Sequence, residues 1–293
     1  MPSISTTIRL TTLKISLIFT GIRRRKEGTN DAFNTQHLYT LSSRPLHPLP
    51  RLNKPRNLQR HFKRNLAIKT MTTSILSDPE QARFNMIEQQ IRPAEVLDQH
   101  VLAVISDTPR EVFVPVNYQE LAFSDLNVPL PNGQLMMKPI MEGRLLQALN
   151  IQASDSILEI GTGSGYFTAL LAKLGNKVQS VEIDAAIMAS AQDKLNAQGI
   201  NNVTLTHGDA AQGWDQNGTF DVIAITGSLP ILPASFQQQL TVGGRMVAIV
   251  GQAPVMQVLL ITRINESQWS TECLYETDFP ELINAEQPQA FVF

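Results

Sequence analysis

The chain has 293 residues, a formal net charge of −2 and a hydrophobic content of 43%, which is typical of a globular protein. Its single cysteine, Cys273, excludes an intramolecular disulfide and suits a reducing compartment, so we expect a cytoplasmic protein. Beyond residue 70 there are only two histidines, and we expect no metal site.

The first 70 residues differ from the rest in charge. Residues 1–70 contain 14 Lys and Arg residues and two acidic residues, whereas residues 71–293 contain 10 Lys and Arg residues and 24 acidic residues. No helical or strand period is sustained, and the apolar run ISLIFTGI is too short to span a bilayer. We expect a disordered basic extension. Three origins stay open: a true translation start at Met71, a mitochondrial-type targeting segment, or a nucleic-acid-binding tail.

Helical sequence dominates the start of the following domain. Asp78 and Pro79 form an N-cap and first-turn pair, and apolar residues then recur at helical spacing. Further helices are predicted over 95–108 and 140–150, with irregular, proline-rich chain over 110–139 between them. Residues 79–149 are therefore expected to add a helical layer to the domain.

Beyond residue 155, predicted strands and helices alternate, which indicates an α/β fold with a mostly parallel sheet covered on both faces. The last two strands follow each other without a helix and predict a C-terminal β-hairpin. The predicted strands number seven and the helices three: strands 156–160, 177–183, 202–208, 220–226, 243–251, 256–264 and 270–279; helices 165–175, 184–199 and 232–240.

A glycine-rich loop, ILEIGTGSGYF, joins the first of these strands to a helix. The spacing is not the G-x-G-x-x-G of dinucleotide sites, and no lysine follows as in a Walker loop. The pattern is E-x-G-x-G-x-G. Its acid, Glu159, would repel a pyrophosphate but suits a ligand that carries an ammonium and a sulfonium group. The pattern therefore favours S-adenosylmethionine.

Two further acids follow the next two predicted strands. Glu182 ends the second strand, where a carboxylate can accept both ribose hydroxyls, and Asp209 follows the third, within reach of an adenine amino group. Each residue also has a plainer interpretation, as a solvated strand end or a turn, and Asp184 is better explained as a helix N-cap. Because ligands of open α/β sheets bind at the carboxyl ends of strands, the ordered placement favours a cofactor site.

Several blocks together resemble the protein-L-isoaspartate O-methyltransferases, a family of class I S-adenosylmethionine-dependent methyltransferases. The blocks are TPREVFVPVNYQELAFSDLNVPL, LEIGTGSGY, GDAAQGW and VGGRMVAIVG, within residues 80–280. The resemblance implies a Rossmann-like methyltransferase domain over 71–293 and O-methylation of isoaspartyl carboxylates in damaged proteins, a repair reaction. The cofactor-binding residues that it implies are Glu159, Gly161, Thr162, Gly163, Ser164, Gly165, Glu182 and Asp209.

The chain departs from the family in NGQLMMKPIMEG. The family has Gly-Gln-Thr-Ile-Ser-Gln-Pro here, and its Ser is the residue usually assigned to the active site. Met137 occupies that position and cannot donate a hydrogen bond. Lys138 follows, either as a contact for the acceptor carboxylate or as a solvated loop residue. The catalytic residue is therefore left unassigned.

Three functions remain in competition. The first is methylation of isoaspartyl residues in proteins or peptides, the second is methylation of a different, small-molecule acceptor by the same fold, and the third is cofactor binding without catalysis. The segment AITGSLPIL lacks the Asp/Asn-Pro-Pro-aromatic motif of adenine and glutamine N-methylation. The intact cofactor acids argue against the third function. We expect a monomer that binds neither nucleic acid nor membrane.

Overall fold

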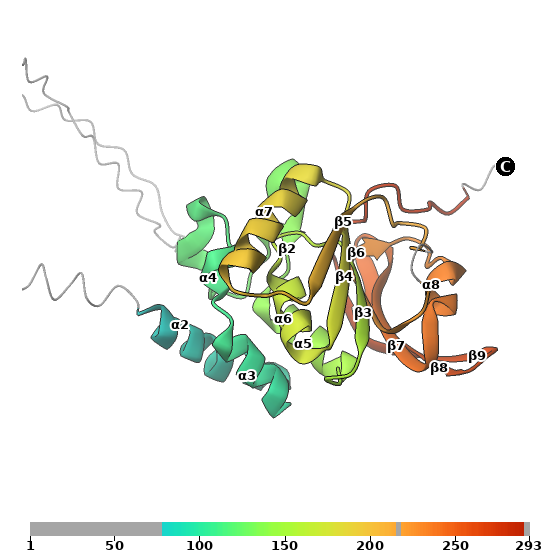
Figure 1. Ribbon diagram of the computed structural model, residues 1–293, viewed down its shortest axis with the longest axis horizontal. Helices are drawn as coiled ribbons and strands as arrows, with labels where there is room; N and C mark the ends of the chain where they lie inside the picture. The colour runs from blue at the N-terminus through green and yellow to red at the C-terminus, as the bar shows by residue number, and fades with distance from the viewer. Residues whose placement is uncertain (1–77, 215–217, 290–293) are drawn as a thin grey trace, which may run out of the picture. The chain divides into compact units, whose positions relative to one another are not determined.

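The computed structural model describes residues 78–214 and 218–289 (Figure 1). The basic extension predicted over residues 1–70 lies outside the described residues. Among those described, no helix is long and apolar enough to cross a lipid bilayer. They also contain no group of three or more His, Cys, Asp or Glu side chains placed to hold a metal ion.

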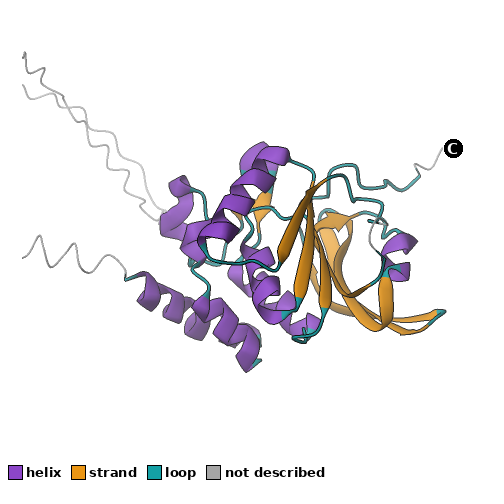
Figure 2. Ribbon diagram, viewed as in Figure 1, coloured by secondary structure: helices purple, strands orange, loops and turns teal. Residues whose placement is uncertain are grey.

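A seven-stranded sheet organises the domain, in the order β5-β4-β3-β6-β7-β8-β9 (Figure 2). The pairs among β5, β4, β3, β6 and β7 are parallel, and β8 and β9 continue the sheet antiparallel to β7 as a hairpin. Both features were predicted from the sequence. The strands are β3 Ser156–Ile160, β4 Lys177–Glu182, β5 Val203–His207, β6 Phe220–Leu229, β7 Leu240–Gln252, β8 Val255–Asn265 and β9 Gln268–Thr277.

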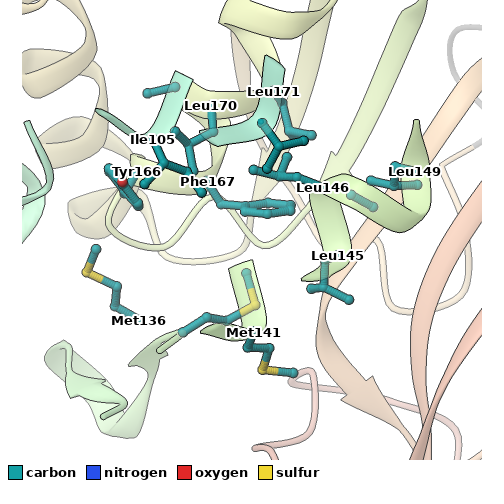
Figure 3. Packing of buried hydrophobic residues seen from close by; sticks show 14 of the residues in the cluster. Ile105, Met136, Met141, Leu145, Leu146, Leu149, Tyr166, Phe167, Leu170 and Leu171 are labelled. Atoms are coloured by element: carbon teal, nitrogen blue, oxygen red, sulfur yellow. The ribbon is translucent and has the colours of Figure 1, made fainter. Parts of the chain in front are cut away.

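Side-chain alternation along the strands divides the core into two clusters. Ile157 packs with helices on one face of the sheet, while its neighbour Leu158 packs on the other face with Phe236 of α8. Figure 1 shows α5, α6 and α7 against the first face and α8 against the second. These helices are α5 Pro139–Leu149, α6 Tyr166–Leu174, α7 Ala185–Ala197 and α8 Ala234–Gln238. Figure 3 shows how α5 and α6 side chains interlock in the larger cluster.

The predicted N-terminal helical layer is present but more divided than expected. The helix predicted over 95–108 begins only after Asp98, whose carboxylate accepts hydrogen bonds from the amides of His100 and Val101. Glu95 has a φ of 68°, which no helix residue can adopt, so the turn before Asp98 stays separate. The elements are α2 Pro79–Met86, the π-turn η1 Ile87–Ile91, the 3₁₀ turn η2 Arg92–Ala94 and α3 Gln99–Asp107.

The stretch expected to be irregular, residues 110–139, contains short ordered elements. Its prolines limit each element to a few residues, because a proline donates no backbone hydrogen bond. A two-stranded antiparallel hairpin forms where Val128 pairs with Met136. The elements are α4 Arg110–Phe113, η3 Val116–Leu121, β1 Val128–Pro129, η4 Pro131–Gly133 and β2 Leu135–Met136.

Candidate functional site

A pocket lies at the carboxyl ends of β3, β4 and β5, where these parallel strands meet the loops that follow them, and Thr226 of β6 also lines it. Gly161, Gly163, Glu182 and Asp209, all predicted from the sequence, line it together. These residues come from three different strand ends, and the fold brings them to one cavity, as expected for a ligand site in an open α/β sheet.

The glycine loop owes its shape to backbone conformations that other residues avoid. Gly161, Gly163 and Gly165 have φ angles of 95°, 53° and 84°. A Cβ on Gly161 would lie 2.6 Å from Oγ1 of Thr226, whose hydroxyl donates to the carbonyl oxygen of Gly161 at 2.6 Å. The loop therefore has no room for a side chain at Gly161, and its backbone lies directly against the pocket.

Glu182 connects the glycine loop to the end of β4. Its side chain is buried, Oε2 accepts from the Gly163 amide at 2.9 Å, and Oε1 accepts from the Asp184 amide at 3.1 Å. Each carboxylate oxygen can accept a second hydrogen bond, so the group retains acceptor capacity toward the pocket. Asp184 caps α7 by accepting from Ala186 and Ile187, which confirms its interpretation as an N-cap.

Asp209 also lines the pocket and belongs to a small hydrogen-bond network. Its Oδ1 accepts from the Ala211 amide at 3.0 Å, and its Oδ2 accepts from the side-chain amide of Asn284 at 2.8 Å. Asn284 belongs to a C-terminal segment, residues 278–285, that contributes Phe279 and Leu282 to the pocket wall. These hydrogen bonds fix the Asp209 carboxylate just beyond the carboxyl end of β5.

Glu159 lies beneath the glycine loop and is not among the residues that line the pocket. It is fully buried, and its Oε2 accepts from Oγ1 of Thr168 at 2.5 Å and from Oγ of Ser180 at 2.6 Å. Burial raises the pKa of Glu159 to about 8. Thr162 shares a hydrogen bond of 2.6 Å with Ser180, so this cluster supports the loop from below. Glu159 lines neither pocket, and its contact with the cofactor stays a prediction.

The β1–β2 hairpin covers the pocket from the helical side. Leu130 and Leu135 line the cavity, and the side-chain amide of Asn132 at the hairpin tip donates to the carboxylate of Asp184. Sequence reasoning missed this cover, and also missed Thr226 and the C-terminal segment. The tip carried one usable signal, the Asn132-Gly133 pair that is typical of a tight turn.

A smaller pocket adjoins the first and shares Leu135, Gly161, Gly163 and Thr226 with it. Its other walls come from the remainder of the glycine loop, including Thr162 and Ser164, and from four side chains: Met136, Met137, Glu142 and Phe167. Three of these side chains are apolar, and Glu142 is a buried carboxylate.

Arg110 of α4 supports this smaller pocket from behind. It is fully buried and donates to the backbone carbonyl of Met137 at 2.6 Å, to that of Ala122 at 2.8 Å, and to the carboxylate of Glu142. Lys138 is only half-buried and does not belong to the lining of either pocket. Its backbone amide donates to Oδ1 of Asn127 at 3.1 Å.

Comparison with known proteins shows the family of the chain. The family model for protein-L-isoaspartate(D-aspartate) O-methyltransferase matches residues 81–287. The chain belongs to this family. A protein-L-isoaspartate O-methyltransferase from Pelobacter propionicus is 36% identical over 74% of this chain and 96% of its own length. One from Roseiflexus castenholzii is 38% identical over 68% of this chain and 90% of its own.

Solved structures agree on the fold. A Plasmodium falciparum protein assigned to the same enzyme class, crystallised with S-adenosyl-L-homocysteine, superposes with a TM-score of 0.59 at 18% identity, covering 70% of this chain and 98% of that one. A second protein-L-isoaspartate O-methyltransferase gives a TM-score of 0.58. The predicted Rossmann-like methyltransferase fold is confirmed, and so is the prediction of an S-adenosylmethionine-dependent O-methyltransferase.

Proposed function

We propose that this protein transfers a methyl group from S-adenosylmethionine to the side-chain carboxylate of an isoaspartyl residue in a damaged protein or peptide. The observation that carries the proposal is the pocket in which the glycine-loop backbone, Glu182 and Asp209 converge at the strand ends. Family membership supports the same reaction, and no finding favours a small-molecule acceptor.

The residues of the larger pocket fit the cofactor. The backbone at Gly161 and Gly163, which carries no side chains and lines the pocket, allows close approach of a ligand. Glu182 has acceptor capacity left, which supports its predicted role toward the ribose hydroxyls, and the acceptor oxygens of Asp209 support its predicted contact with the adenine amino group. The cofactor supplies an electrophilic methyl on a sulfonium; the protein binds it, orients it and excludes water.

The acceptor requires little from the protein beyond position. A carboxylate is already an anion, so no general base is needed, and alignment of its oxygen with the methyl can supply most of the rate. Met137 is 4% exposed and lines the smaller pocket, where it contributes an apolar wall in place of the family's hydroxyl. Its backbone carbonyl is held by Arg110, which fixes the segment without a side-chain donor.

An acceptor panel tests the proposal. Labelled S-adenosylmethionine is incubated with an isoaspartyl peptide, with the aspartyl peptide of the same sequence, and with free dicarboxylic amino acids. We expect base-labile label on the isoaspartyl peptide alone, since a methyl ester hydrolyses in mild base. Label confined to the free small molecules would reject a protein acceptor. Lys138→Ala in the same panel distinguishes the two interpretations of Lys138: reduced labelling indicates a contact with the acceptor carboxylate, and unchanged labelling indicates a solvated loop residue.

A further inference from the structure

A second buried carboxylate faces the glycine loop, and the cofactor contacts predicted from the sequence do not include it. Glu142 lies on α5, is 2% exposed, and lines the smaller pocket together with Thr162 and Ser164 of the glycine loop. The neighbouring walls are Met137 and Phe167, both nearly fully buried; Figure 3 shows Phe167 across from the methionines of α5 and β2. Glu142 is the acidic residue of that lining.

The side chain of Glu142 is held in one orientation. Its Oε2 accepts from Nη1 of Arg110, whose Nε and Nη2 donate to the carbonyls of Ala122 and Met137. The Arg110 guanidinium also lies 4.8 Å from the ring centre of Tyr166, so it cannot move without breaking several contacts. Among the described residues, no donor bonds to Oε1 of Glu142. One carboxylate oxygen is thus left for a ligand in the smaller pocket.

The chemistry of this pocket matches the amino-acid portion of the cofactor. Methionine and phenylalanine side chains suit a thioether and its methylenes, and a buried carboxylate oxygen suits an ammonium group. Glu159 belongs to the lining of neither pocket, and its Oε2 bonds to Thr168 and Ser180. We propose that Glu142 binds the α-ammonium group of the cofactor and thereby orients its sulfur for methyl transfer. This inference rests on the proposed function, since it assumes S-adenosylmethionine in the adjoining pocket.

The charges around Glu142 make the contact sensitive to pH. Burial raises its pKa to about 7, against the opposing effect of Arg110 on α4. The nearby carboxylate of Asp125 raises it further, and the phenol of Tyr166 on α6 faces the same group. An ammonium ligand binds the ionised form, so its affinity should increase as the pH rises toward and beyond 7, and binding at lower pH should release a proton.

Calorimetry with two ligands tests the assignment. S-adenosylhomocysteine carries the ammonium group, whereas 5′-methylthioadenosine shares the adenosine and the sulfur but lacks it. We expect Glu142→Gln to weaken S-adenosylhomocysteine binding by about 10- to 100-fold, the value of a charge-assisted hydrogen bond, and to change methylthioadenosine binding by less than about twofold. Glu111→Gln is the matched control, because Glu111 also pairs with an arginine, Arg83, but lines neither pocket. It should change neither affinity.

Equal losses for both ligands would give Glu142 a merely structural role and overturn the assignment, as would no loss at all. Failure of the wild type to bind either ligand would instead reject the cofactor site itself. If the Glu142→Gln variant does not fold, the pH dependence of ligand affinity in the wild type tests the assignment instead. Between pH 6 and 8 the affinity for S-adenosylhomocysteine should rise about tenfold while that for methylthioadenosine stays constant. A parallel pH dependence for the two ligands would contradict the assignment.

Discussion

The carboxylate of Glu182 accepts a hydrogen bond from the backbone amide of Gly163, with 2.9 Å between Oε2 and the nitrogen. This contact joins the end of β4 to the glycine loop that follows β3. It links Glu182, the proposed acceptor for the ribose, to the backbone of the loop. Loss of the carboxylate should therefore affect both.

Glu182→Ala should weaken S-adenosylmethionine binding by about 1.5–3 kcal/mol, or roughly 10- to 150-fold, because a charged acceptor for the ribose hydroxyls is removed. Calorimetry measures the change directly. Glu276→Ala, at an exposed position on β9, is the control and should leave the affinity unchanged. Unchanged affinity in Glu182→Ala would remove Glu182 from the site.

Gly161 and Gly199 form a natural pair for testing the crowding of the loop. Both have positive φ, but a Cβ on Gly199 would meet nothing within 4 Å, whereas one on Gly161 would lie 2.6 Å from Oγ1 of Thr226. Gly199→Ala should cost about 1–3 kcal/mol of backbone strain, and Gly161→Ala about 1–3 kcal/mol more for the clash. Thermal unfolding compares the two variants.

If the clash with Thr226 destabilises Gly161→Ala, removal of the Thr226 hydroxyl should relieve it in that variant and not in Gly199→Ala. Adding Thr226→Ala to Gly161→Ala removes the obstructing oxygen and should recover part of the lost melting temperature, at about 2–4 °C per kcal/mol. The Gly199→Ala background should gain nothing from Thr226→Ala. Identical melting temperatures for Gly161→Ala and Gly199→Ala would mean that Thr226 does not constrain the loop.

Glu159 should make the unfolding free energy depend on pH. Its folded-state pKa, about 8, lies above the ordinary value of 4.5, so its contribution to stability is complete below about pH 4.5 and is lost as the pH rises through 8. Glu159→Gln keeps the neutral shape at every pH. The variant should match the wild type near pH 5 and exceed it by at least ~1 kcal/mol near pH 8.5, or about 2–4 °C in melting temperature. A constant difference across this range would show that Glu159 does not titrate in the fold.

Asn132 should control how long the cofactor stays bound. Its side-chain amide ties the tip of the β1–β2 hairpin to Asp184, over the pocket. Asn132→Ala removes that bond, worth about 0.5–1.5 kcal/mol, and should raise the dissociation rate of S-adenosylhomocysteine about 2- to 10-fold. Asn265→Ala, at the end of β8, serves as the control in the same stopped-flow experiment. An unaltered rate in Asn132→Ala would mean that the hairpin does not retain the ligand.

The sequence predicted the sheet well because its strands are apolar runs separated by clear helix signals, and it placed Glu182 and Asp209 at strand ends for the same reason. It could not show that Glu159 lies outside both pocket linings, since a strand pattern shows that a residue is near a strand end but not which way its side chain points. The hairpin over the pocket was missed because its strands, Val128–Pro129 and Leu135–Met136, are too short for a period to appear. The C-terminal segment was missed because its contacts with Ser228 and Asp209 join positions far apart in the chain.

The rate of methyl transfer to an isoaspartyl peptide tests the central claim most directly. It is measured with labelled S-adenosylmethionine for the wild type and for Met137→Ser, with the aspartyl peptide of the same sequence as the blank. The wild type should label the isoaspartyl peptide and leave the blank unlabelled. Met137→Ser restores a donor toward the developing charge and should raise turnover, by up to about 10²-fold. No transfer above the blank by either protein, at saturating cofactor and peptide, would contradict the account.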